Sequence, residues 1–431
     1  MNRDKQKYKW HIKIHREGEE IPSFFASHGI PEELARILMH RGIDSEEKLS
    51  HFLYDNLDHL SDPFLMKGMD KAVSRILQAI DQHEKIVVYG DYDVDGITST
   101  SIMMRCLSSL GADVGYYIPQ REKEGYGLNR EAVNHLAEEG YHLLITVDCG
   151  ISSAALISEA PKGLDIIVTD HHTPPELLPS CVAVLNPHQK DCPYPYKELA
   201  GCGVAYTLCR GLYMKRLGRD YDGTVELAAL GTIADVVSLT GENRILVKEG
   251  MKRFIHTPIK GLAALLKASG IVHDDTTEIR RADQVSFGLA PRLNAAGRIA
   301  RASEGVRLMT TESAEEAERL AQKLCEINTM RQQIERDIFE QAKSRMAELG
   351  IENDMAVVVD GKDWHPGVIG IVASRILESC HRPVFVITVR DGIGKGSCRS
   401  IPAFNIYKAL STQSDILLKF GCHNMAAGFS L

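Results

Sequence analysis

Short β-rich runs alternate with helical stretches from about residue 84, and this pattern constrains the fold more than any other feature of the chain. The β-rich runs lie at 85–90, 112–118, 143–148, 165–170 and 182–187. The stretches of helical composition between them lie near 97–110, 130–139 and 152–159. Strands that alternate with helices form parallel sheets covered by helices on both faces. We therefore predict a doubly wound α/β fold with a parallel sheet.

A second, smaller α/β unit is predicted near the C-terminus, after a long helix. Residues 312–349 are rich in Glu, Ala, Arg and Gln and contain neither Pro nor Gly, which predicts one long charged helix. Further helices are expected at 203–217, 224–239, 245–268, 367–379 and 404–411, with strands at 355–360 and 383–389 and a Gly-rich segment at 392–400. The predicted parts are a mostly helical lead-in (1–80), the parallel-sheet domain (81–310), a connecting helix (311–350) and the smaller α/β domain (351–431).

Length and composition exclude several classes of protein. A chain of 431 residues has room for two or three domains with hydrophobic cores, so it is not a peptide-sized binding motif. No apolar run could span a bilayer and the charged N-terminus lacks the features of a secretory signal, so we expect a cytoplasmic protein without a membrane segment. The ten cysteines include no CxxC pair, which argues against a zinc knuckle or a disulfide framework.

Charge is unevenly distributed along the chain. The net charge of −8 argues against a basic coat for nucleic acid. Residues 81–100 nevertheless hold five acids against one lysine, whereas residues 281–310 hold five arginines against two acids, and residues 381–410 are also basic. This division is the pattern expected if a metal centre faces a surface that binds an anionic substrate.

Acidic residues follow several of the predicted strands. Asp91, Asp148 and Asp170 each end a β-rich run, and the carboxyl ends of parallel strands meet at one edge of the sheet, where ligands bind. Asp91, Asp93 and Asp95 place three carboxylates at alternate positions, an arrangement that needs divalent cations or a solvated loop. A calcium loop is disfavoured because its twelfth-position Glu is missing, and a plain acidic turn remains an alternative.

Other candidate ligands are weaker when taken one by one. His171 and His172 follow Asp170 and could be ordinary hydrogen-bonded surface residues, and Asp148 could cap the helix that follows it. Asp235 is more informative, because we expect it within an apolar helix, where an unpaired carboxylate is costly to bury. Ligands of mixed Asp and His type favour Mn²⁺ or Mg²⁺ over structural zinc.

Several motifs, taken together and in order, resemble those of the DHH phosphoesterase family, named for its Asp-His-His signature. These motifs are YGDYDVDG at 89–96, VDCGIS at 147–152, TDHH at 169–172 and GTIADVV at 231–237. Four more narrow the resemblance to the bacterial branch of single-strand-specific 5′ to 3′ DNA exonucleases: APRLNAAGR at 290–298, WHPGVIGIVASR at 364–375, GSCRS at 396–400 and GCHNMAAGFSL at 421–431. The resemblance covers about residues 60–431.

The resemblance implies a catalytic DHH domain with a centre of two divalent cations, Mn²⁺ or Mg²⁺. The implied metal ligands are Asp93, Asp95, Asp148, His171 and Asp235, with Asp148 bridging both ions. His172 would face the scissile phosphate, and Asp91 would lie behind the ligands. In the branch that hydrolyses pyrophosphate, a His lies four residues before the first ligand Asp; the residue here is Tyr89, which argues against a pyrophosphatase.

Substrate contacts are expected from the basic part of the chain. Arg292 and Arg298 can bind phosphates in bidentate fashion, with pairing to the long acidic helix as the alternative. The resemblance implies that Arg121, Ser397 and Arg399 form a pocket for a 5′-terminal phosphate. It also implies that His423 lines a groove in a DHHA1-like C-terminal domain. Cys422 replaces a family glycine beside His423, and Tyr126 either stacks on a base or is buried.

The predicted function is metal-dependent hydrolysis of single-stranded DNA from its 5′ end, in DNA repair and recombination. The resemblance implies a single-stranded-DNA-binding protein and a helicase as partners. It also implies a following oligonucleotide-binding barrel, so we expect this chain to be a fragment or truncated form without that barrel. One rival is a phosphodiesterase for short oligoribonucleotides or cyclic dinucleotides, and another is a non-catalytic DNA-binding scaffold, which would have lost ligand carboxylates.

Overall fold

The computed structural model describes residues 20–431 except 122, 126, 274, 275, 277, 280, 352, 353, 391 and 424. The chain divides into two compact units, Met1–His59 and Leu60–Leu431. In the first unit, helices α1 (Ser23–Ser27), α2 (Glu32–His40) and α3 (Glu46–Tyr54) precede the 3₁₀ turn η1 (Leu57–His59). Phe25, Leu38 and Leu49 form its small core, which the apolar positions of the short helices create.

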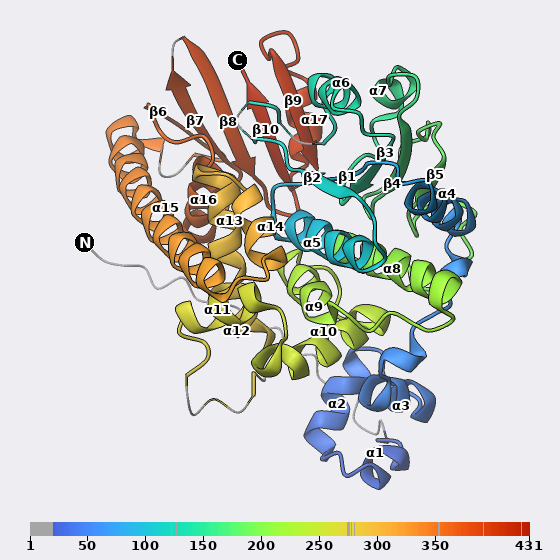
Figure 1. The fold of residues 1–431 in the computed structure, drawn as a ribbon. Coiled ribbons are helices and arrows are strands. Elements are labelled where there is room, and N and C mark those ends of the chain that lie inside the picture. The colour runs from blue at the N-terminus through green and yellow to red at the C-terminus, as the bar shows by residue number, and fades with distance from the viewer. Residues whose placement is uncertain are drawn as a thin grey trace. The chain divides into compact units, whose positions relative to one another are not determined.

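The second unit contains a five-stranded parallel sheet (Figure 1). Its order is β2-β1-β3-β4-β5, and its strands are β1 (Ile86–Gly90), β2 (Val114–Tyr117), β3 (Leu143–Val147), β4 (Asp165–Thr169) and β5 (Ala183–Leu185). Strands β1 and β3 are buried along their whole length, as continuous apolar runs in a sheet covered on both faces should be. The predicted doubly wound parallel sheet is confirmed.

Helices cover both faces of this sheet. α6 (Arg130–Glu138) and α7 (Ala154–Ser158) pack on one face, where Val133, Leu136 and Ile157 meet apolar residues of β1, β3 and β4. α4 (Met69–Asp81), which follows the turn η2 (Pro63–Leu65), contacts β5, while α5 (Val94–Ser109) contacts β1 and β3 and α8 (Gly201–Leu217) contacts β3 and β4.

Six helices follow α8 and extend this domain: α9 (Val225–Ala234), α10 (Gly241–Arg253), α11 (Lys260–Ala268), α12 (Ala282–Gly288), α13 (Ala290–Ile299) and α14 (Ser303–Thr310). The continuous helix predicted over 245–268 is wrong. α10 ends at Arg253, a 3₁₀ turn η3 (Phe254–His256) follows, and α11 begins at Lys260. Pro258 lies in this gap, and proline has no N–H to donate within a helix. The helix predicted over 224–239 also ends early, at Ala234.

One long helix, α15 (Ala314–Leu349), confirms the helix predicted over 312–349. Ser313 caps its N-terminus and Gly350, with φ 66°, ends it. Leu320, Ala321 and Leu324 are buried in its first half, which contacts α11 and α13. Ile338, Ala342 and Met346 in its second half belong to the core of the C-terminal domain. The helix therefore contributes to two cores.

The C-terminal domain contains a second five-stranded sheet, which Figure 1 shows beside α15. Its order is β6-β7-β8-β10-β9, and its strands are β6 (Val357–Lys362), β7 (Val384–Arg390), β8 (Ile393–Arg399), β9 (Lys419–His423) and β10 (Ala426–Ser430). Only β6 and β7 pair in parallel; the other pairs are antiparallel. α16 (Ile369–Cys380) and α17 (Ile406–Ser411) complete the predicted smaller α/β domain. Most of the Gly-rich segment at 392–400 forms β8. No helix in the described part of the chain is long and apolar enough to cross a membrane.

Candidate metal centre

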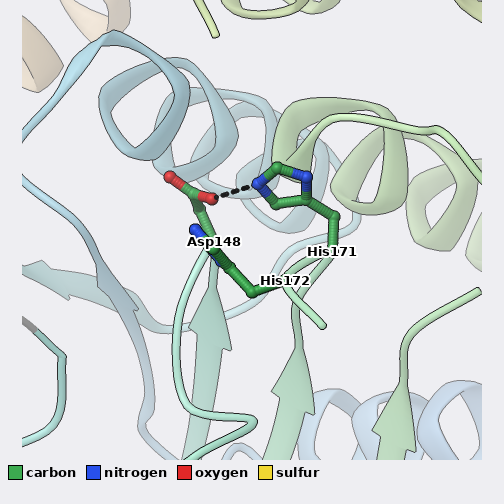
Figure 2. Close-up of side chains that lie close together, drawn as sticks. All are labelled: Asp148, His171 and His172. Carbon is green, nitrogen blue, oxygen red and sulfur yellow. Dashed lines mark ion pairs between the residues drawn. The ribbon is translucent and has the colours of Figure 1, made fainter. Parts of the chain in front are cut away.

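Carboxylates and imidazoles from four segments meet at the carboxyl edge of the parallel sheet. The segments are the turn after β1, the ends of β3 and β4, and the residue after α9. Side-chain ligand atoms lie within 4.8 Å of one another in three groups, namely Asp91/Asp93/Asp148, Asp95/His171/Asp235 and Asp148/His171/His172. Figure 2 shows Asp148 facing His171. All five predicted metal ligands are therefore brought together.

The turn after β1 holds its carboxylates in defined positions. Asp93 is the N-cap of α5, where its Oδ1 accepts the Gly96 N–H at 3.0 Å. The carboxylate of Asp95 accepts the N–H of Gly201 at 2.7 Å and that of Cys202 at 2.8 Å. These donors are the first two residues of α8, so the helix N-terminus stabilises the negative charge of Asp95.

Asp148 follows β3 in a left-handed backbone conformation, with φ 59°. The alternative that it caps the following helix is wrong, because the N-cap of α7 is Ser153. Its Oδ1 lies 3.1 Å from Nε2 of His171, the contact drawn in Figure 2. The same Nε2 lies 3.8 Å from Asp95 and 3.7 Å from Asp235, so His171 is placed among three carboxylates.

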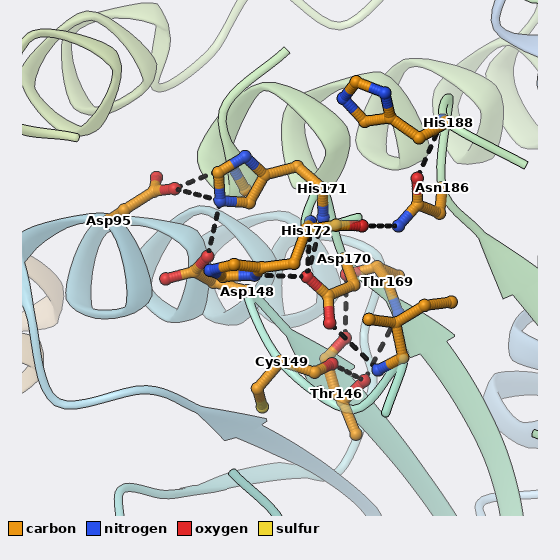
Figure 3. A network of polar contacts seen from close by, with 12 residues as sticks. Asp95, Thr146, Asp148, Cys149, Thr169, Asp170, His171, His172, Asn186 and His188 are labelled. Carbon is orange, nitrogen blue, oxygen red and sulfur yellow. Dashed lines mark hydrogen bonds and ion pairs between the residues drawn. The ribbon is translucent and has the colours of Figure 1, made fainter. Parts of the chain in front are cut away.

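Asp170 positions the histidine pair. Its Oδ2 accepts the Ile151 N–H at 2.9 Å, and its Oδ1 accepts the backbone N–H groups of both histidines. Nδ1 of His172 lies 2.7 Å from the same Oδ1, a contact that Figure 3 draws as a dashed line. Burial alone would lower the pKa of His172, but the hydrogen bond and charge of Asp170 raise that pKa to about 9. The Asp170 carboxylate thus favours the protonated form of His172.

The sequence predicted Asp235 within an apolar helix, and this prediction is wrong. α9 ends at Ala234, and Asp235 is its C-cap, followed by Val236 with φ 63°. The helix ends here because the left-handed Val236 cannot continue it. The Asp235 side chain is 22% exposed and its Oδ2 faces His171, so the end of the helix rather than its interior delivers this carboxylate.

Electrostatics favour cation binding at this centre. Burial and the charges of neighbouring carboxylates raise the pKa of Asp148 well above its usual value and that of Asp235 to about 8. At this centre, Asp91 Oδ1, His171 Nε2 and Asp235 Oδ2 are buried and make no hydrogen bond to another described residue. Buried polar groups normally have partners, and an oxygen-rich donor set with one imidazole fits Mn²⁺ or Mg²⁺. The residues present thus fit divalent cations.

Cationic side chains lie close to the carboxylates. Burial, followed by the like charges of Arg121, Arg399 and Arg331, lowers the pKa of Arg298 to about 10. The Arg298 guanidinium donates to Gly367 O at 3.2 Å, and that of Arg399 donates to Ser397 Oγ at 3.3 Å. The Arg121 guanidinium lies 5.1 Å from the ring centre of Tyr92, the residue between Asp91 and Asp93. The structure therefore brings together Arg121, Arg298, Ser397 and Arg399.

Of three other predicted substrate residues, Arg292 is described and does not join this group. Arg292 donates to the carbonyls of Gly288 and Ser269, and its Nε lies 3.3 Å from Cys325 Sγ. Arg292 thus contacts α15 through the thiol of Cys325 and not through an acidic residue. Its hydrogen bonds connect the backbone at Gly288 to the backbone at Ser269. His423 ends β9, but its side chain lies outside the described residues, as does the whole of Tyr126.

Sequence reasoning missed two residues that shape the centre. Asp170 was noted as an acid at a strand end and as part of the TDHH motif but was given no role, although it orients His172. Asn294, whose Oδ1 accepts the Val94 N–H at the start of α5 at 3.2 Å, was passed over in favour of the arginines around it. A polar residue at a fixed place within the 290–298 motif was the available signal.

Comparisons with known proteins agree with this fold and centre. The model of the DHH family N-terminal domain matches residues 85–233, and that of the DHHA1 domain matches residues 353–431. The single-stranded-DNA-specific exonuclease RecJ of Bacillus subtilis is 43% identical over 99% of this chain and 53% of its own length. RecJ of Dickeya dadantii is 38% identical over 93% of this chain and 72% of its own length.

A solved structure shows the same fold. RecJ from Thermus thermophilus in complex with Mn²⁺ superposes with a TM-score of 0.81 at 37% identity, over 95% of this chain and 58% of that one. The parallel sheet, its carboxylate edge and the mixed sheet that follows define a protein of the DHH class with a DHHA1 domain. Within that class, the chain belongs to the RecJ family. It spans about half the length of the B. subtilis relative.

Proposed function

We propose that this chain is a metal-dependent exonuclease that hydrolyses single-stranded DNA from its 5′ end. The observation that carries the proposal is the proximity of a buried Asp/His centre to a cluster of arginines. Among the described residues, Arg121, Arg298 and Arg399 form no ion pair with a carboxylate. Clustered arginines without acidic partners bind phosphate groups well, because guanidinium and phosphate match in charge and geometry.

The centre is proposed to hold two divalent cations, Mn²⁺ or Mg²⁺, on Asp93, Asp95, Asp148, His171 and Asp235. When bound, such a pair supplies an activated water and neutralises charge on the phosphoryl oxygens. The chain's own residues hold these ligands in place: the start of α8 fixes Asp95, and Asp170 fixes the backbone of both histidines. Protonated His172, with its pKa near 9, offers positive charge to a phosphate oxygen.

The 5′ end of the strand is proposed to bind at Arg121, Ser397 and Arg399. Arg298, whose guanidinium contacts the chain before α16, would bind the next phosphate. The RecJ relatives are named as single-strand-specific DNA exonucleases, which supports this substrate class. A cytoplasmic location, roles in repair and recombination, and partnership with a helicase and a single-stranded-DNA-binding protein stay predictions.

The rival functions are less well supported. All five ligand residues are present, whereas a non-catalytic scaffold is expected to have lost some of them. A phosphodiesterase for dinucleotides would need a small closed pocket. The relatives that match over most of this chain are named as DNA exonucleases.

The proposal is tested by digestion of labelled strands with Mn²⁺. A 5′ label should be released at once as mononucleotide, whereas a 3′ label should remain on progressively shorter strands; duplex DNA, RNA and pyrophosphate should persist. Asp148→Asn should lower the rate by about 100-fold or more, because a charged metal ligand is lost. Asp113→Asn makes the same change at the opposite edge of the sheet and should have little effect. Digestion by Asp148→Asn at the unmodified rate would contradict the proposal.

A further inference from the structure

A network of buried and half-buried polar side chains anchors the loop that carries Arg121. This loop, residues 118–129, connects β2 to α6 and includes Gly125 and Gly127, both with positive φ. Glycine makes a loop flexible, so an arginine on such a loop needs other contacts to hold it in one place. The contacts come from Tyr89, Tyr117, Glu124 and Asn129.

Glu124 is the centre of the network. Its Oε2 accepts hydrogen bonds from Tyr117 Oη at 2.7 Å and from Asn129 Nδ2 at 2.8 Å. Its Oε1 accepts the N–H of Gln120, the residue before Arg121, at 2.7 Å. Three donors therefore hold one carboxylate, and one of them is the backbone immediately beside Arg121.

Tyr89 ties the same network to the sheet. It lies on β1 and is fully buried, its ring stacked on that of Tyr117 with the centres 5.2 Å apart. Its hydroxyl donates to Gly127 O at 3.1 Å and accepts from Asn129 Nδ2 at 3.2 Å. Tyr89 thus connects the sheet to the loop through its hydroxyl group. Asp91 and Asp93, which follow it in the sequence, belong to the metal centre.

From these contacts we infer that Tyr89, Glu124 and Asn129 are positioning residues that set the enzyme's preference for a 5′-terminal phosphate. They fix the backbone at Arg121, whose guanidinium then lies over Tyr92, beside the carboxylates. A guanidinium held in place before binding loses less conformational entropy when it captures a phosphate. The inference rests on the proposed function, because it takes Arg121 as a ligand of the 5′ phosphate.

The test measures binding without turnover. Dissociation constants are determined in EDTA for a short single strand of DNA carrying either a 5′ phosphate or a 5′ hydroxyl. Tyr89→Phe keeps the ring but removes the hydroxyl, and Glu124→Gln keeps the shape but removes an acceptor. Each should reduce the ratio of the two affinities about five- to tenfold, the size expected for one or two lost hydrogen bonds. Arg121→Ala should abolish the preference.

Matched controls separate positioning from general destabilisation. Tyr141→Phe removes a hydroxyl from a tyrosine packed in the same core cluster, and Glu131→Gln makes the same charge change on the exposed side of α6. Both should keep the unmodified affinity ratio. Amide hydrogen exchange across residues 118–129 should accelerate in Tyr89→Phe and Glu124→Gln but not in either control.

The outcomes also separate this inference from the proposed function. A 5′-phosphate preference that Tyr89→Phe and Glu124→Gln reduce, in a protein that shows no hydrolysis in Mn²⁺, would overturn the proposed function and support the positioning role. A preference that disappears in Arg121→Ala but is unchanged in Tyr89→Phe and Glu124→Gln would overturn the inference alone. No preference in the unmodified protein would overturn it as well, since no pocket would then be there to position.

Discussion

Two residues at or beside the metal centre, Asp148 and Val236, adopt left-handed backbone conformations, with φ 59° and 63°. This conformation costs an L-residue about 1–2 kcal/mol, and β-branched side chains rarely adopt it. Asp148 is a proposed ligand, and Val236 directly follows another. Val236 is 83% exposed, so packing does not compensate for its strain. The strain accompanies the sharp end of α9, which delivers Asp235 to the centre.

Replacing this valine should therefore stabilise the protein. Val236→Gly should raise the free energy of unfolding by up to about 1 kcal/mol, because the relief of strain exceeds the added entropy of the unfolded glycine. Val358→Gly, at a 52% exposed position on β6, is the matched control and should lower stability by a similar amount. The melting temperatures of the two variants and of the unmodified protein, measured in EDTA, report both changes in stability. Equal losses in the two variants would show that Val236 is not strained.

At the scale of elements, α8 and α9 pack closely against the metal centre at two glycines, Gly201 and Gly231. A Cβ at Gly201 would lie 2.7 Å from Asp148 Cβ and 2.8 Å from its Oδ1, and a Cβ at Gly231 would lie 2.9 Å from Asp95 Oδ1. A Cβ at Gly201 would therefore press on Asp148, and a Cβ at Gly231 would also lie 2.6 Å from Cys202 Sγ. These two glycines let the helices lie close enough to hold the ligands.

Gly201→Ala should weaken metal binding, since the new methyl group must displace Asp148. We expect the affinity for Mn²⁺, measured by calorimetry, to fall about tenfold or more, the usual effect of disturbing the support of a ligand. Gly203→Ala lies in the same helix, but its methyl group would meet only the flexible side chain of Leu199, at 3.1 Å. It should bind Mn²⁺ normally. Equal affinity in both variants would show that the close approach of α8 is unimportant.

At the scale of the whole second unit, the fold brings acidic and basic segments that are far apart in sequence to one place. Arg298 of α13 donates to Gly367 O in the segment before α16, so it joins the parallel-sheet domain to the C-terminal domain. Its charge also lies near that of Arg399 on β8 and that of Asp93. The cationic cluster therefore depends on both domains.

Salt dependence should distinguish the two arginines predicted from the 290–298 motif. Arg298→Gln should reduce the slope of log affinity for single-stranded DNA against log salt by about 0.7, the value for one lost phosphate contact. Arg292→Gln should keep the slope but lower the melting temperature, because Arg292 holds the carbonyls of Gly288 and Ser269. An unchanged slope in Arg298→Gln would remove this residue from the binding surface.

Local patterns in the sequence were sufficient to predict strands β1 to β7, the long helix and the ligand types, but not strands β8, β9 and β10. Buried strands such as 86–90 are apolar runs, α15 lacks breakers over 36 residues, and Asp91, Asp148 and Asp170 follow strands whose carboxyl ends must share an edge. The break at Pro258 was equally local and could have been predicted from the absence of its N–H.

Tertiary structure decided which partner each polar group meets. Arg292 and Arg298 lie six residues apart in one motif. In the structure, however, Arg292 donates hydrogen bonds to backbone carbonyls, whereas Arg298 lies among arginines from three other segments. Asp95 is held by the start of a helix more than 100 residues later, and Asp170 by its contacts with Ile151 and His172. Residue type and spacing determine what a side chain can bind, because those are local properties. The choice among possible partners depends on distances across the folded chain, which packing alone sets.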